Sequence, residues 1–337
     1  MIVPHKIEQL PADRTAAGNE ELHGSRHPLV TQLCQLMADP AGPFSKRPKP
    51  GYLRGIDFYS VHNLLMILQA MGDAFRKTHG RYPDIVAPEM LSDKIFASKF
   101  LRPLKVPQSG NKLLTSSFIP QAARELTSCA PIVWHSPVAK VPRGDAIEPG
   151  VYYLKTSHGC DMYRRIAYPL NDEQADALDE EFGRYLKRRY GVASGNWWHN
   201  VFKPELMVEK AIGSKEFTTS LNYLVIGGEI VRLVAFQKLA DGYRKTNFDP
   251  DWTAEADQDT QPAQFRMPSD AAKERMAEAA RLIGAKLGYV RVDFLLDDDE
   301  RPFLGEVTFT PGNGLNPMSP ELEEKLGKMW DWSDAVG

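Results

Sequence analysis

Apolar residues recur at helical spacing in several stretches of the chain, and capping residues mark where those stretches begin and end. The spacing predicts helices over His27–Met37, Val61–His79, Ser92–Leu101, Asn171–Tyr190 and Ser269–Leu287. The boundary signals are Asn171 with Gln174, then Gly191, Ser269 and Gly288, and finally Ser319 before Pro320, which opens a last helix. The four prolines of Asp39–Tyr52 indicate an extended connection, and the first 30 or so residues read as loose.

Shorter stretches with strand-like patterns alternate with these helices from Pro131 onward. They predict strands over Ile132–His135, Val151–Lys155, Met207–Ile212, Glu216–Ile226, Glu229–Gln237, Tyr289–Leu296 and Pro302–Thr310. Gly227-Gly228 predicts a tight hairpin between two of these strands, and the acidic turn Asp297–Arg301 joins the last two. The fold class is therefore α+β with antiparallel sheet, in candidate lobes of about 1–130, 131–213 and 214–337.

Composition narrows the function classes. The 337 residues are 42% hydrophobic and 25% charged, with a formal charge of −3, so no basic field for nucleic acid is expected. No apolar run is long enough for a membrane span, and the first residues do not resemble a signal peptide. Cys34, Cys129 and Cys160 are scattered and odd in number, which favours a reducing cytoplasm, and the histidines show no zinc-ligand spacing.

A predicted strand ending in Lys155 runs into the small-residue loop Ser157-His158-Gly159. Such a loop can turn backbone N–H groups toward phosphate oxygens, and the lysine adds a compact positive charge. An ordinary hairpin with an exposed lysine explains the same pattern. His158 fits a hydrogen-bonding loop residue better than a catalytic base.

A second candidate segment contains Glu209, Lys210 and Ile212, with Glu216 shortly after them. A strand of this kind can present its backbone edge to adenine, and a following glutamate can accept both ribose hydroxyls. A half-buried strand with solvent-facing glutamates is the alternative reading.

Two acids on successive strands form the sharpest feature. Alternation places Arg291 and Asp293 on one face of their strand, and Glu306 and Thr308 on one face of the next. The short turn makes the strands antiparallel neighbours, so both carboxylates converge as hard oxygen ligands suited to Mg²⁺. Surface acids on a hairpin are the alternative, although the apolar neighbours make unpaired charges costly. The following Gly312-Asn313-Gly314 either approaches a ligand closely or simply turns the chain.

Taken in order, these segments resemble the ATP-grasp superfamily, and most closely its TupA-like amidoligase family, named for teichuronopeptide biosynthesis. The resemblance spans about Ser92 to Trp332 and is most specific in Tyr289–Phe294 and Leu304–Gly314; Tyr152–Met162 and Asp249–Trp252 also match. It implies two α+β lobes clasping ATP within residues 91–337, with 131–213 as lid or central lobe and 214–337 as the C-terminal metal-binding lobe. Residues 1–90 would form a partly helical N-terminal region.

The resemblance also implies individual roles. Nucleotide contacts would come from Lys155, Ser157, His158, Gly159, Glu209, Lys210, Ile212, Glu216, Lys238 and Lys99, with Lys94 competing for the place of Lys99. Asp293, Glu306 and Thr308 would bind the metal, although Thr308 stands where many ATP-grasp enzymes have asparagine, and a hydroxyl is a weaker oxygen ligand. Gly312, Asn313 and Gly314 would meet the substrate, while Arg291 and Lys155 would serve catalysis.

The function implied is that of a cytoplasmic ligase that uses ATP and Mg²⁺ to join a carboxylate to an amine through an acyl phosphate. The carboxylate would belong to a small molecule or a glycan, in polysaccharide or cell-surface glycan biosynthesis. Three rivals remain open: an ATP-grasp phosphotransferase, a nucleotide-binding protein without catalysis, and a glycosyltransferase. The last rests on Asp249-Pro250-Asp251 as a metal-binding pair of acids, where a structural turn is favoured.

Overall fold

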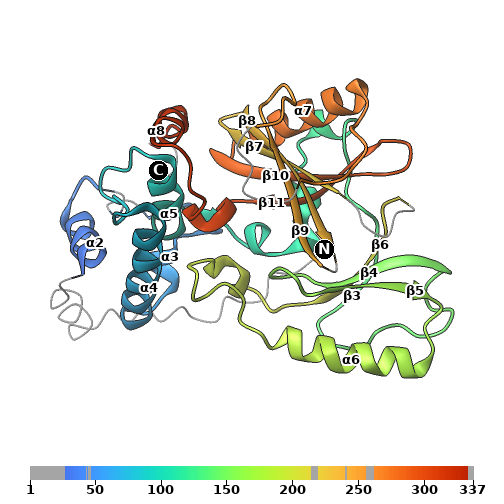
Figure 1. Cartoon of the computed structure of the whole chain (residues 1–337). Coiled ribbons are helices and arrows are strands. Elements are labelled where there is room, and N and C mark those ends of the chain that lie inside the picture. Colours follow the sequence, from blue (N-terminus) through green and yellow to red (C-terminus); the bar gives the residue numbers. More distant parts are fainter. Residues whose placement is uncertain are drawn as a thin grey trace. The chain divides into compact units, whose positions relative to one another are not determined.

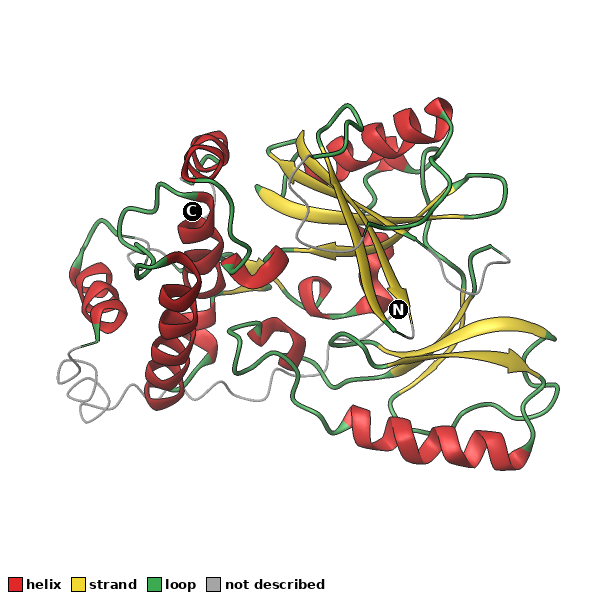
Figure 2. Cartoon of the chain, in the orientation of Figure 1, coloured by secondary structure: helices red, strands yellow, loops and turns green. Residues whose placement is uncertain are grey.

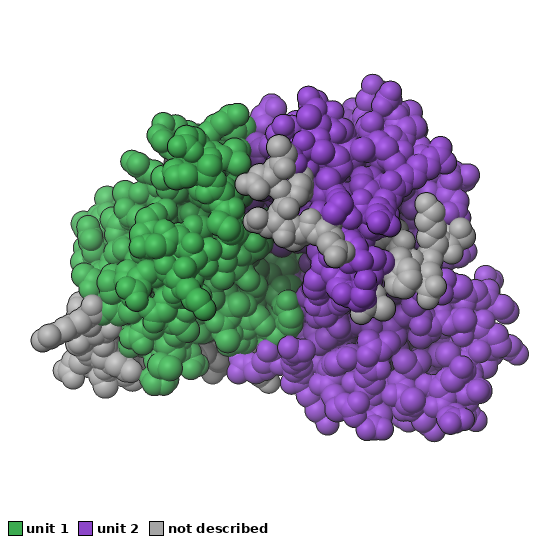
Figure 3. Space-filling model, viewed as in Figure 1, with its two compact units in different colours: residues 1–109, 190–202, 310–337 green, residues 110–189, 203–309 purple. Residues whose placement is uncertain are grey.

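The computed structural model describes residues 27–42, 44, 47–213, 219–239, 241–255 and 262–332. Most of the N-terminal segment that was expected to be loose lies outside these residues, and so does Glu216. The chain divides into two compact units (Figure 3). Unit 1 contains residues 1–109, 190–202 and 310–337, and unit 2 contains residues 110–189 and 203–309.

Unit 1 is mainly helical. Its helices are α2 (Pro28–Ala38), α3 (Gly55–Phe58), α4 (Val61–His79), α5 (Leu91–Leu101) and α8 (Pro320–Met329), with the 3₁₀ turns η4 (Trp197–Asn200) and η5 (Pro311–Gly314). The short strands β1 (Tyr52–Leu53) and β2 (Leu104–Lys105) pair with each other, and η1 (Gln108–Gly110) follows them.

Helix α5 is buried along its whole length, so its polar groups need partners inside unit 1. The backbone N–H of Ser92 donates to the Glu323 carboxylate of α8 at 2.8 Å. The Lys94 ammonium donates to the carbonyl oxygens of Gly327 and Trp330, both at 2.7 Å. Two charged side chains thus join α5 to the C-terminal helix, one at each end of α8.

Unit 2 contains two antiparallel sheets (Figures 1 and 2). The four-stranded sheet has the order β3 (Ile132–Ser136), β6 (Leu206–Lys210), β4 (Gly150–Thr156), β5 (Tyr163–Tyr168). The five-stranded sheet has the order β11 (Pro302–Thr308), β10 (Tyr289–Leu296), β7 (Ser220–Ile226), β8 (Glu229–Leu239), β9 (Gly242–Phe248). The remaining elements are η2 (Lys112–Phe118), η3 (Gln121–Ala123), α6 (Asp172–Leu186) and α7 (Asp270–Gly284).

Helix α6 covers one face of the four-stranded sheet (Figure 1). Alternation along β4 points Tyr152 and Leu154 toward this helix, where they join a core that includes Val208 and Phe182. The intervening residues of the same strand therefore face the opposite side of the sheet, which is where the candidate site lies.

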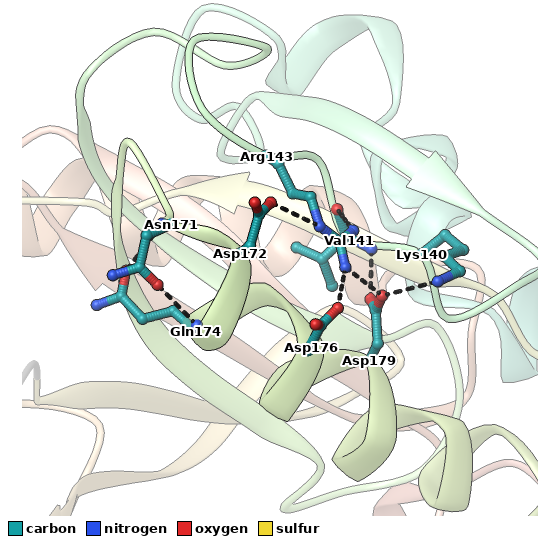
Figure 4. A network of polar contacts seen from close by, with 8 residues as sticks. All are labelled: Lys140, Val141, Arg143, Asn171, Asp172, Gln174, Asp176 and Asp179. Carbon is teal, nitrogen blue, oxygen red and sulfur yellow. Dashed lines mark hydrogen bonds and ion pairs between the residues drawn. The ribbon is translucent and has the colours of Figure 1, made fainter.

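Ionic contacts position the start of α6 (Figure 4). Asn171 and Gln174 form the predicted capping box. Asp179, one to two turns into the helix, accepts the Val141 N–H at 2.6 Å and lies 3.2 Å from the Arg143 guanidinium. Arg143 also pairs with Asp176, so the helix is joined to the loop before β4 as well as to the sheet.

Helix α7 covers one face of the five-stranded sheet in the same way. Val292 and Phe294 of β10, the strand that α7 contacts, are fully buried, as is Met276 of the helix. The approach is closest at Gly284, where an added Cβ would lie 2.4 Å from Cγ1 of Val225 on β7. Only glycine permits this spacing without displacing the helix.

The predicted fold class is confirmed, and the caps Asn171, Ser269 and Ser319 are all in place. Gly227 and Gly228 have positive φ and connect β7 to β8 as predicted. The predicted ends of two helices are wrong. Helix α6 ends at Leu186 rather than Tyr190, and α7 ends at Gly284 rather than Leu287. The run after Leu186 is basic and offers no apolar residue to bury, so no packing extends α6 toward Gly191.

Strands β5 and β9 have no counterpart among the sequence predictions. Both are edge strands with several charged residues, which weakens their β signal. No helix within the described residues is long and apolar enough to span a membrane.

The contacts of Lys94 lead to a stability prediction. Replacing Lys94 with Met should lower the free energy of unfolding by about 1.5–3 kcal/mol, the range for hydrogen bonds to a charged group, because two carbonyls lose their donor. Urea unfolding measures the change. Lys328→Met, which removes an exposed lysine of α8, is the matched control and should have little effect. Equal stability of both variants would contradict a structural role for Lys94.

Candidate functional site

A cavity of about 690 Å³ lies within unit 2, lined by side chains from both sheets, from η2 and from the loop after β4. This volume is within the range of small-ligand pockets. Its charged lining residues are Lys112, Lys155, Arg165, Lys210, Lys238, Asp161, Glu209, Asp293 and Glu306. The mixture of cations and carboxylates is suited to a ligand that carries phosphate together with a divalent metal.

The two predicted metal acids are direct cross-strand partners. Asp293 of β10 pairs with Glu306 of β11 in the antiparallel register, so their side chains share one face of the sheet. Asp293 is 7% exposed. Burial raises the pKa of the Asp293 carboxyl, and the neighbouring charge of Glu306 raises it further, while Arg291 opposes the shift. Two like charges placed this closely are stable only when a cation lies beside them or when one of the two carboxyls is protonated.

Arg291 supplies such a cation. Its Nε donates to Oδ1 of Asp293 at 2.7 Å, and its Nη2 donates to Oδ2 at 2.6 Å, so the guanidinium holds both carboxylate oxygens. Burial alone lowers the pKa of Arg291, but the charge of Asp293 outweighs this and the pKa is raised. Thr308 is the cross-strand partner of Arg291, and its hydroxyl is buried without a hydrogen-bond partner among the described residues.

Lys155 lies on the cavity face of β4, where its ammonium pairs with Glu209 of β6. The register forms a row across the four-stranded sheet that consists of Ile132, Glu209, Tyr153 and Arg165, and all four line the cavity. Lys155 also lies over the Tyr153 ring, 5.4 Å from its centroid. The cavity face of this sheet is therefore an aromatic and aliphatic surface with charged groups at its edge.

The loop after β4 is held firmly at its base. Ser157 exchanges hydrogen bonds with Glu205, because its N–H donates to the Glu205 carbonyl and its hydroxyl accepts from the Glu205 N–H. His158 is buried, and its Nε2 lies 2.9 Å from the Arg188 carbonyl oxygen. Burial lowers the pKa of His158. Gly159, with φ of 70°, begins the part of the loop that lines the cavity.

The sequence of this chain matches a known protein family over part of its length. The family described as TupA-like ATPgrasp matches residues 164–330, a segment that includes Arg291, Asp293 and Glu306. Over these residues, just under half of the chain, the protein is similar to TupA-like ATP-grasp proteins. The resemblance expected from the sequence is therefore confirmed, and so is the α+β fold class that it implied.

Other similarities are more distant. The D-alanine–D-alanine ligases of two Staphylococcus epidermidis strains are 27% identical over 135 residues, which cover 37% of this chain and 34% of the relative. The match thus spans about a third of the curated relatives' length. Among solved structures, D-alanine–D-alanine ligase from Bacillus anthracis in complex with ATP has 14% identity and a TM-score of 0.42, covering 67% of each chain. An L-amino acid ligase from Bacillus licheniformis has 15% identity and a TM-score of 0.38, covering 61% of this chain and 44% of that one.

Sequence reasoning missed Lys112, a further cation of the cavity. Lys112 is the first residue of η2, which Asn111 caps, and its ammonium donates to the Gly159 carbonyl inside the cavity. Burial lowers the pKa of Lys112, and the charge of nearby Glu306 opposes that shift. The lysine precedes an irregular segment without periodicity, so only the fold brings it beside Lys155 and the acids.

Lys238 of β8 lies in the cavity lining as well and pairs with Asp161 of the loop. This ion pair, reinforced by the Tyr163 ring 5.5 Å below the ammonium, connects the two sheets of unit 2. The hydrogen bond to Asp161 raises the pKa of Lys238. Lys210 and Ile212 also line the cavity, at the end of β6 where the adenine hinge was expected.

Lys99 lies in unit 1, fully buried, and its ammonium donates to the Ser194 carbonyl at 3.0 Å. Lys94 is likewise occupied within unit 1. Gly312, Asn313 and Gly314 form η5 in the same unit, all with positive φ. Their assignments to nucleotide and substrate stay predictions.

Asp249-Pro250-Asp251 forms a turn, as the sequence favoured. The Trp252 N–H donates to the Asp249 carbonyl, and the Asp251 carboxylate accepts the Thr253 N–H, both at 2.9 Å. Asp251 is thus engaged by the backbone two residues on, a local contact typical of an aspartate in a turn.

Burial of Lys99 leads to a prediction on pH dependence. Desolvation lowers the pKa of Lys99 from 10.5 to about 7 in the folded protein. Between these values the unfolded chain binds more protons than the folded one, so this lysine makes stability rise with pH. Urea unfolding at pH 7 and pH 9 should show a larger gain for the natural chain than for Lys99→Met. Equal gains in the two proteins would contradict the lowered pKa.

Proposed function

We propose that this protein is an ATP-dependent, ADP-forming ligase that activates a carboxylate as an acyl phosphate and joins it to an amine. The observation that carries the proposal is the pair Asp293 and Glu306, opposed across two strands in a cavity rich in lysine. The relatives named as D-alanine–D-alanine ligases support the reaction class.

The donors in this cavity fit Mg²⁺. Asp293 and Glu306 are hard oxygen ligands that are held side by side. The described residues contain no group of three or more His, Cys, Asp or Glu side chains at metal-binding geometry. Two carboxylates suit Mg²⁺ in particular, because it usually takes its remaining ligands from water and substrate phosphates. When bound there, the metal would neutralise phosphate charge. Thr308 remains a candidate third oxygen donor.

Three lysines on different elements would receive the phosphates. Lys112, Lys155 and Lys238 all line the cavity, and each is now held by a carbonyl or carboxylate of the protein. A triphosphate offers stronger acceptors than these partners. Gly159 keeps the loop backbone free of a side chain where it passes the cavity, so its N–H can approach phosphate oxygens.

The adenine base of ATP would occupy the region beside Tyr153, Glu209, Lys210 and Ile212. These residues combine ring and aliphatic surface with the end of strand β6, whose backbone can hydrogen-bond to a purine edge. Glu216, which the sequence assigns to the ribose, lies outside the described residues. Ser157 and His158 would act through the loop, because both are buried below its cavity-lining part.

In this reaction the protein would orient the substrates and stabilise the charge that develops. A substrate carboxylate attacks the terminal phosphate, ADP leaves, and the amine then displaces phosphate from the acyl group. No side-chain nucleophile takes part. Arg291, whose planar guanidinium suits oxyanions, would stabilise the charge that develops beside the acids, and Lys155 would neutralise the phosphates.

A cytoplasmic role in polysaccharide or cell-surface glycan synthesis completes the proposal. It rests on the family named for teichuronopeptide biosynthesis and directs the choice of substrates. A screen of ADP release should cross uronic acids and amino acids, as carboxylates, with amino acids and amino sugars, as amines. Amine-dependent ADP release is expected, whereas release that needs no amine would favour a phosphotransferase.

The metal assignment predicts the effect of removing either acid. Asp293→Asn and Glu306→Gln should keep the fold but lower ADP release at least about 100-fold, the scale for losing one main electrostatic contact in a transition state. Turnover in the substrate pair found by the screen measures this. Glu255→Gln, an acid of the same unit that does not line the cavity, is the control. Near-normal turnover in either cavity variant would remove the metal from this pair.

The phosphate assignment predicts weaker nucleotide binding when a lysine is removed. Lys155→Ala and Lys112→Ala should each weaken ATP binding by about 1–3 kcal/mol, because a charge-assisted hydrogen bond is lost. Isothermal titration gives the affinities. Lys273→Ala, on α7, should bind ATP normally. If a lysine variant keeps the natural affinity, that lysine is not part of the site.

A further inference from the structure

The Arg291–Asp293 pair occupies the oxygens that the proposed metal needs. The two residues lie on the same face of β10, and the guanidinium contacts both carboxylate oxygens at 2.7 and 2.6 Å. A carboxylate has about four lone pairs, and a bidentate arginine takes one on each oxygen. Because Asp293 is only 7% exposed, access to the lone pairs that remain is restricted to the side that lines the cavity.

A second observation at the same place concerns Thr308. It is the direct cross-strand neighbour of Arg291, and its Oγ1 is buried with no hydrogen-bond partner among the described residues. A buried hydroxyl without a partner is costly in a stable arrangement. The arrangement with Arg291 fully engaged on Asp293 therefore leaves a neighbouring polar group unsatisfied, as expected of one of two alternative states.

The geometry points to a partner exchange at Arg291, an inference that rests on the proposed function. Without ligand, Arg291 holds Asp293 and neutralises the buried charge. When the divalent metal binds Asp293, it takes over that neutralisation and the guanidinium gives up at least one of its two hydrogen bonds. The released N–H groups then face the cavity or the Thr308 hydroxyl. Arg291 is thus a competitor of the metal as well as a group that serves the reaction.

The two possible roles of Arg291, competing with the metal or positioning Asp293 for it, predict opposite changes in metal affinity when the arginine is altered. If Arg291 competes for the oxygens of Asp293, weakening its grip should tighten metal binding. If it only orients Asp293 as a ligand, weakening its grip should loosen metal binding. Arg291→Lys separates the hydrogen-bond geometry from charge, since lysine keeps the positive charge but cannot form the bidentate contact.

The test is a titration of the full chain with Mn²⁺ alone, in which electron paramagnetic resonance counts the free ion. Arg291→Lys should bind Mn²⁺ about tenfold more tightly than the natural chain, the scale of one charge-assisted hydrogen bond. Arg291→Gln, which also removes the charge, should bind at least as tightly and serves if the lysine variant does not fold. Thermal unfolding monitors the fold of each.

The matched control is Arg232→Lys. Arg232 also grips a carboxylate with two nitrogens, that of Glu255, on the same five-stranded sheet but away from the cavity lining. Its Mn²⁺ affinity should equal that of the natural chain. Unchanged or weaker Mn²⁺ binding in both Arg291 variants would overturn the exchange.

Asp293→Asn separates this inference from the proposed function. If that variant binds Mn²⁺ as the natural chain does, the metal assignment itself fails and the exchange fails with it. If it loses Mn²⁺ while the Arg291 variants bind no tighter, the metal assignment stands and the exchange alone is wrong.

Discussion

Two carboxylates face each other across one pair of strands, and much of unit 2 is arranged around that constraint. Antiparallel register fixes Asp293 opposite Glu306, and the burial of Asp293 limits how far water screens their repulsion. Arg291 compensates within the same strand, and Lys112 brings a further cation near Glu306 from a distant segment. These two cations therefore offset the negative charge of the carboxylate pair.

The same logic extends to the other charged side chains. Lys155 is paired with Glu209 and Lys238 with Asp161, so these two cations already have protein partners before any ligand enters. Paired charges of this kind keep the site ordered at modest cost, because each can exchange its partner for a stronger acceptor. The helices α6 and α7 contribute indirectly, since each supports one sheet from behind.

Much of this was readable from the sequence because it depends on local rules. The short turn predicted that Asp293 and Glu306 lie on neighbouring strands, and Asn171, Ser269 and Ser319 marked helix starts. Lys112 was missed because its segment has no period and its partners lie about 45 to 195 residues further along the chain. Lys99 was assigned to the nucleotide on resemblance, and burial inside unit 1 is a property that spacing does not reveal.

Gly284 shows how far the acids depend on packing elsewhere. Its missing side chain lets α7 approach Val225 of β7, and β7 is hydrogen-bonded to β10, the strand of Asp293. A residue with a Cβ at position 284 would press on β7 and, through the ladder, on the spacing of the carboxylate pair. A position without any chemical group of its own therefore helps to set the spacing of the carboxylate pair.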